Sequence, residues 1–145
     1  MATKADFTEQ EWKDLSEGPT GLVLWVSSID PGFLARVKES WAASQAVVKG
    51  ATTELERELA KPAKPDFATG SLEQQRDGVI GALTRGIATL QAKAPDEVEP
   101  FKAWIDGIAD ATAEAAGGVT AAEGEAIAAV KAALAGAAPT GPTPA

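Results

Sequence analysis

A helix-start signal occurs three times in the chain and constrains the fold more than any other feature. It is the capping box, a Ser or Thr followed three residues later by Glu or Gln, whose side chains bond each other's backbone N–H groups. The three boxes pair Thr8 with Glu11, Ser71 with Gln74 and Thr120 with Glu123. Apolar residues recur after each box at three- and four-residue spacing, which is typical of an amphipathic helix. The sequence therefore predicts an all-α fold.

Proline and glycine mark the ends of the predicted helices. We expect a single compact helical bundle of five or six helices over residues 1–136 and a disordered C-terminal tail over residues 137–145. The tail is rich in Pro, Gly and Ala and has no large apolar side chain to bury. The whole chain is 45% hydrophobic, which is enough for one packed core.

The first half of the chain predicts three helices. A short helix starts at the first capping box and ends near Gly18, and a second starts at Pro19, because proline suits the first turn of a helix. The third and longest covers residues 33–60, with Val48 among its apolar positions and a possible bend at Gly50.

The second half predicts three more helices. One begins at the second capping box, buries Leu72 and ends before Pro95. The next opens between Pro95 and Pro100, where both prolines fit a first turn, and ends at Gly117. The last begins at the third capping box and ends at Gly136.

Composition excludes several classes of function. The 145 residues contain no His and no Cys, so the commonest general base, the thiol nucleophile and the imidazole and thiolate metal ligands are missing. The formal charge of −8 argues against nucleic acid as a partner. The N-terminus does not resemble a secretory signal and no apolar run could span a bilayer, so we expect a cytoplasmic protein.

The most distinctive polar feature is a row of three carboxylates, Asp106, Asp110 and Glu114, at four-residue spacing. Like charges at this spacing destabilise a helix by roughly 0.2–0.5 kcal/mol per pair. A bound Ca²⁺ or Mg²⁺ would relieve this repulsion, and so would basic side chains such as Lys102 or those of a neighbouring helix. The second interpretation is a solvated face without a ligand.

The remaining polar and aromatic candidates have simpler interpretations. Asp30 follows a helix and could be one ligand of a cation site or part of an ordinary turn. Glu54, Glu56 and Glu58 alternate along a helix and predict a solubilising surface. The four tryptophans lie on apolar helix stripes, which predicts core packing rather than a ligand pocket.

Two helix junctions resemble a paired pattern of the TerB-like (tellurite-resistance) helical family. Residues 26–32, Val-Ser-Ser-Ile-Asp-Pro-Gly, lead to Glu39, and residues 115–123, Ala-Ala-Gly-Gly-Val-Thr-Ala-Ala-Glu, lead to the last helix. The resemblance implies a small all-helical fold, a role in stress-associated complexes and an acidic divalent-cation site that includes Asp30, Glu39 and Glu123. The chain departs from the pattern at Pro31, and at Gly117 where an Asp is expected.

Together these features predict a non-enzymatic protein that acts by binding an unidentified protein partner. It requires no cofactor, although its carboxylates could hold Ca²⁺ or Mg²⁺ weakly. Two alternatives remain open: an Mg²⁺-dependent enzyme that uses Asp106, Asp110 and Glu114, and a purely structural subunit of a larger assembly.

Overall fold

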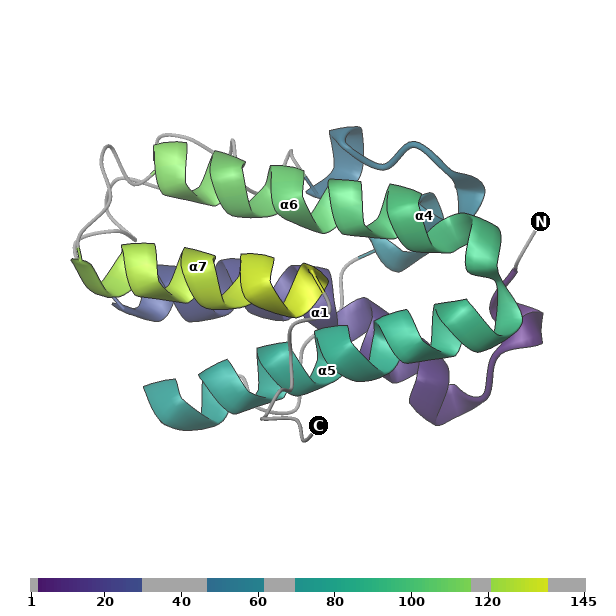
Figure 1. Ribbon diagram of the computed structural model, residues 1–145, viewed down its shortest axis with the longest axis horizontal. Coiled ribbons are helices and arrows are strands. Elements are labelled where there is room, and N and C mark those ends of the chain that lie inside the picture. The colour runs from purple at the N-terminus through teal and green to yellow at the C-terminus, as the bar shows by residue number, and fades with distance from the viewer. Residues whose placement is uncertain (1–2, 30–46, 62–69, 116–120, 136–145) are drawn as a thin grey trace, which may run out of the picture.

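The computed structural model describes residues 3–29, 47–61, 70–115 and 121–135 (Figure 1). Over these residues the fold is all-α, as predicted. The helices that lie within them are α1 (Glu9–Ile29), α4 (Glu54–Leu59), α5 (Leu72–Lys93), α6 (Val98–Ala115) and α7 (Ala121–Leu134), with two 3-10 turns, η1 (Lys4–Asp6) and η3 (Pro95–Glu97). The predicted tail over residues 137–145 lies outside the described residues.

The helices pack in two pairs around a shared core. Helix α1 runs along α5, and α6 lies beside α7, which also contacts α1 and α5 (Figure 1). One apolar cluster takes residues from every one of these helices; its members include Leu15, Leu22, Leu55, Leu59, Leu83, Phe101, Ile105 and Val130. The burial of these side chains is the main favourable contribution to folding.

Helix α1 corrects the prediction of two short helices, because it continues without a break through Gly18 and Pro19. An interior proline costs about 3 kcal/mol or more, since it has no N–H to donate. Here Leu15 and Leu22 on either side of the proline are completely buried. Burying such a side chain contributes about 1.5–3 kcal/mol, so packing offsets the local preference for a break.

The predicted long helix over residues 33–60 is also wrong in its described part. Residues 47–49 are helical, a turn follows at Gly50, and α4 starts afresh at Glu54. The Thr53 side chain caps this second helix by accepting a hydrogen bond of 3.1 Å from the Glu56 N–H. Val48, expected in the core, is 62% exposed because the helical stripe does not continue across this break.

The junctions around α5 and α6 agree with the prediction. Ser71 Oγ accepts from the Gln74 N–H at 3.1 Å, and Gln74 Oε1 accepts from the Ser71 N–H at 2.8 Å. Helix α5 ends at Lys93, Pro95 opens η3, and Pro100 lies in the first turn of α6. Leu72 was expected in the core but is 45% exposed, because it is the first residue of its helix.

Candidate functional site

The acidic row on α6 is engaged by a basic side chain of α7. Lys131 Nζ lies 2.9 Å from Asp110 Oδ1 and 3.5 Å from Asp106 Oδ1. The hydrogen bond to Asp110 and then the charge of Asp106 raise the pKa of Lys131. Lys102 lies 3.5 Å from Glu99 instead of meeting the row. A neighbouring helix thus supplies the positive charge that relieves the repulsion between the two aspartates.

The other nominated metal ligands are only partly described. Asp30 and Glu39 lie outside the described residues, and so do the side chains of Glu114 and Glu123, whose backbones belong to α6 and α7. Within the described part of the chain, no three Asp, Glu, His or Cys side chains are arranged to hold a metal ion. The structure therefore brings together Asp106 and Asp110, with Lys131 between them.

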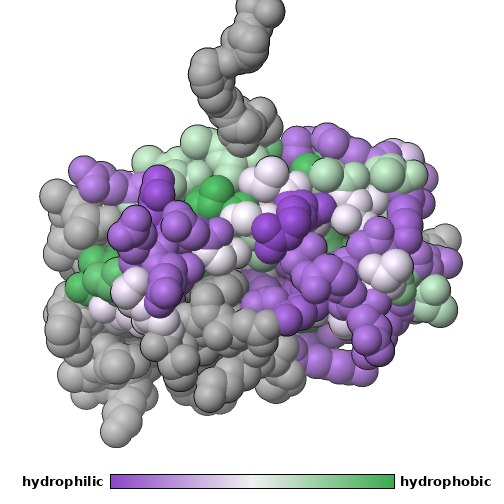
Figure 2. All heavy atoms as spheres, turned by 90° about the horizontal axis from the view of Figure 1, so that it is seen from below, coloured by the Kyte–Doolittle hydropathy of each residue, from purple (hydrophilic) through white to green (hydrophobic). Residues whose placement is uncertain are grey.

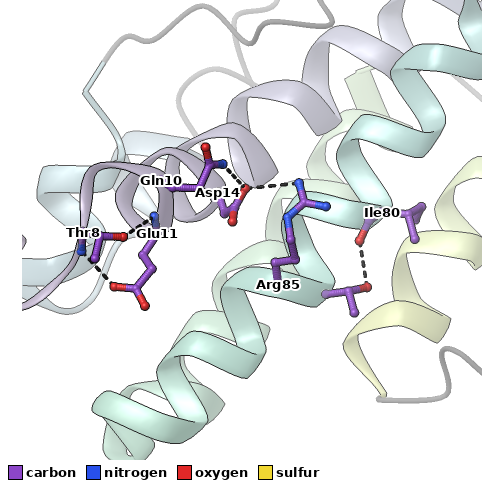
Figure 3. A network of polar contacts seen from close by, with 7 residues as sticks. Thr8, Gln10, Glu11, Asp14, Ile80 and Arg85 are labelled. Atoms are coloured by element: carbon purple, nitrogen blue, oxygen red, sulfur yellow. Dashed lines mark hydrogen bonds and ion pairs between the residues drawn. The ribbon is translucent and has the colours of Figure 1, made fainter.

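A second polar group joins α1 to α5 (Figure 3). The buried carboxylate of Asp14 accepts hydrogen bonds of 3.1 Å from Arg85 on α5 and 3.1 Å from Gln10 one turn earlier on α1. Gln10 and Arg85 both donate to the Asp14 carboxylate, and the rest of the Arg85 side chain extends to the surface. This group therefore holds α1 and α5 in position. We assign it no chemistry.

Glu56 overturns the interpretation of the α4 glutamates as one solubilising surface. Its side chain is 1% exposed, and Oε1 accepts from the Thr52 N–H at 2.8 Å and from Thr52 Oγ1 at 3.2 Å. Its other oxygen, Oε2, is buried and has no hydrogen-bond partner among the residues that the structure describes. Burial first, and then the charge of Glu56, raises the pKa of Glu97 on η3. The charge of Glu56 therefore disfavours the ionised form of the half-buried Glu97, as expected for a nearby like charge.

The N-terminal segment around η1 and the start of α1 are held together, and to the end of α5, by aromatic and charged contacts. Phe7 and Trp12 have ring centroids 6.1 Å apart, and Lys4 Nζ lies 5.6 Å from the centre of the Trp12 ring. Lys93 at the end of α5 forms an ion pair with Glu11. The hydrogen bond from Lys93 is the main cause that lowers the pKa of Glu11, followed by the one from the Thr8 backbone.

Between η1 and α4 lies an open pocket of about 520 Å³, which we call the corner pocket. It is lined by Thr3, Lys4, Ala5, Glu54, Leu55, Arg57 and Glu58. Two of these side chains are cations and two are anions, while the exposed Ala5 adds apolar surface. Sequence reasoning missed this pocket, because no spacing relates residues 3–5 to residues 54–58 before the chain is folded.

The face of the molecule below α5 is mainly polar. Figure 2 shows hydrophilic residues over most of its described surface, with strongly hydrophobic residues in separate spots. Large apolar patches mark many protein interfaces, but none stands out among the described residues on this face. No helix in the described ranges is long and apolar enough to cross a membrane.

Comparison of the chain with protein-family profiles, with curated protein sequences and with solved structures found no match in any of the three. The resemblance to the TerB-like family therefore stays a prediction.

Proposed function

We propose that this protein acts by binding another protein, and that the corner pocket is the binding site. The single observation that carries the proposal is the pocket itself, a cavity of about 520 Å³ that opens between two elements and presents charged and apolar side chains together. Anchor side chains at protein–protein interfaces commonly fill pockets on the partner.

The engagement of the acidic row favours binding over catalysis. In the Mg²⁺-dependent alternative, Asp106 and Asp110 would need free oxygen atoms to hold the ion. Lys131 lies within ion-pair distance of both carboxylates, at 3.5 and 2.9 Å, and competes for those oxygens. A structural subunit of a larger assembly would also act through binding, and it too would need a surface that contacts another protein.

Site-specific photocrosslinking in the native cell tests the proposal. A photoreactive phenylalanine replaces Ala5 in the pocket, and the same residue replaces the exposed Ala132 on α7 as a matched control. We expect the variant at position 5 to give one dominant protein adduct that the variant at position 132 does not give.

The captured protein must then bind when both proteins are purified, with a Kd of about 1 μM or tighter in calorimetry. Identical adducts from positions 5 and 132, or a captured protein that does not bind in isolation, would contradict the proposal.

A further inference from the structure

Some charged side chains around the corner pocket have an interaction partner in the structure, whereas the cation of Arg57 has none among the described residues. Glu58 forms an ion pair of 2.8 Å with Lys61 just outside the pocket. Lys4 places its ammonium 5.6 Å from the centre of the Trp12 ring, a favourable cation–π distance. Arg57 has neither an ion pair nor a ring contact among the described residues. Its guanidinium is therefore the cation in the pocket that is left for a ligand.

The chemistry of an arginine narrows the ligand. A guanidinium presents a planar fork of N–H donors that matches a carboxylate with two parallel hydrogen bonds. Glu54 and Glu58 flank Arg57 on the same short helix and repel a dense negative charge such as a phosphate. A single carboxylate brings one negative charge and suits this setting better.

The apolar lining adds a second requirement. The exposed Ala5 lines the pocket beside the charged groups, together with the small accessible part of Leu55, which is 2% exposed. A ligand that carries an aliphatic group next to its carboxylate would cover this surface and exclude water from the ion pair. A peptide segment with Glu or Asp beside Leu, Ile or Val has both parts.

We infer that the corner pocket binds an acidic side chain of a protein partner, whose carboxylate pairs with Arg57 and whose neighbouring aliphatic side chain packs against the exposed Ala5. This inference rests on the proposed function and names the chemistry that the partner presents. It makes Arg57 the residue that selects the partner.

The test uses two peptides that differ in one charge, acetyl-Leu-Glu-Leu-amide and acetyl-Leu-Gln-Leu-amide. Each is titrated into the full chain labelled with ¹⁵N, and backbone amide shifts are followed by NMR. We expect the Glu peptide to bind with a Kd of about 1 mM or tighter and to move the amides of residues 3–5 and 54–58. The Gln peptide should bind about fivefold more weakly or worse, because it lacks the charge-assisted hydrogen bonds.

Variants separate the role of Arg57 from a general charge effect. Arg57→Gln should weaken binding of the Glu peptide about fivefold or more, and Arg57→Lys should lie between Arg57→Gln and the wild type because it keeps the charge without the fork. Arg76→Gln on α5 removes the same charge from another exposed side chain and should leave binding unchanged. Arg57 is exposed, so its variants should fold, and their amide spectra verify this directly.

Equal binding of the two peptides, shifts confined to other residues, or an equal loss in Arg57→Gln and Arg76→Gln would overturn the inference. Equally tight binding of inorganic phosphate or of free isovalerate would also overturn it, since the site would then be selective for neither a carboxylate nor a peptide. If photocrosslinking finds a genuine partner while the peptides show no selectivity, the carboxylate inference fails and the proposed function stands. If the peptides bind selectively while photocrosslinking finds no genuine partner, the carboxylate inference stands and the proposed function fails.

Discussion

Two glycine-to-alanine changes should alter stability in opposite directions, although both lie inside helices. At Gly18 of α1, an added Cβ atom would lie 2.7 Å from Leu83 Cδ2 of α5. At Gly107 of α6, no described atom lies within 4 Å of the added Cβ atom, apart from its chain neighbours and the backbone of its own helix. Comparing the two variants therefore separates the effect of the close contact between α1 and α5 on stability from the intrinsic cost of a glycine in a helix.

The magnitudes follow from two opposing effects. Replacing an interior glycine by alanine favours a helix by about 1 kcal/mol, and Gly107→Ala should gain most of this. At Gly18 the neighbouring Leu83 side chain is 0% exposed, so a shift away from the added Cβ atom would push it against other core side chains. Overpacking of this kind costs about 1–3 kcal/mol, so Gly18→Ala should lose about 1 kcal/mol after the helical gain is subtracted.

Urea unfolding followed by far-UV circular dichroism measures both free energies of unfolding. We expect Gly107→Ala to unfold at a higher urea concentration than the wild type and Gly18→Ala at a lower one, with similar slopes. If Gly18→Ala were stabilised as much as Gly107→Ala, α1 and α5 would not approach each other closely at Gly18 and Leu83, and the reasoning would be refuted.

Three further perturbations have defined outcomes. Trp104→Phe removes the indole that donates a buried 2.9 Å hydrogen bond to the Val47 carbonyl oxygen, so urea unfolding should show a loss of about 1–3 kcal/mol; an unchanged value would refute this. The pKa of Glu97 is raised from its ordinary value of 4.5, so folding disfavours the ionised carboxylate. The wild type should therefore lose stability relative to Glu97→Gln as the pH rises above 4.5 and through the raised pKa. Parallel curves of stability against pH for the two proteins from pH 4 to pH 8 would contradict this prediction. Asp110→Asn should change the free energy of unfolding by less than about 1 kcal/mol, the range of an exposed ion pair, and millimolar Ca²⁺ should raise the Tm no more than NaCl of equal ionic strength; a Ca²⁺-specific rise that is lost in Asp110→Asn would show a cation site.

Helix starts could be predicted from the sequence wherever the interactions that cause them are local. The Ser71 box begins α5 as predicted, because both of its hydrogen bonds join residues three apart. Thr8 and Glu11 form the same exchange, at 3.1 and 2.8 Å. Pro95 and Pro100 also fall where first-turn geometry permits them. Each of these features depends on a few neighbouring residues.

Other features depend on partners that are distant in the sequence. Pro19 has the local signature of a helix start, and only the packing of α1 on α5 keeps it inside a helix. Glu56 alternates with the exposed Glu54 and Glu58, and its hydrogen-bond partner Thr52 is only four residues away. Its burial nevertheless depends on the packing of α4, through Leu55 and Leu59, into the shared core. Lys131 meets Asp110 across 21 positions of sequence. No periodicity or local spacing contains these facts, so the candidate site could be predicted only in part.

The proline inside α1 has a consequence for the order in which the molecule folds. An isolated peptide of α1 should hold little helix, since Gly18, Pro19 and Gly21 lie together near its centre. Its stable partner, α5, begins only at Leu72 and ends at Lys93. During synthesis on the ribosome, residues 9–29 should therefore become one continuous helix only after residues 72–93 have emerged.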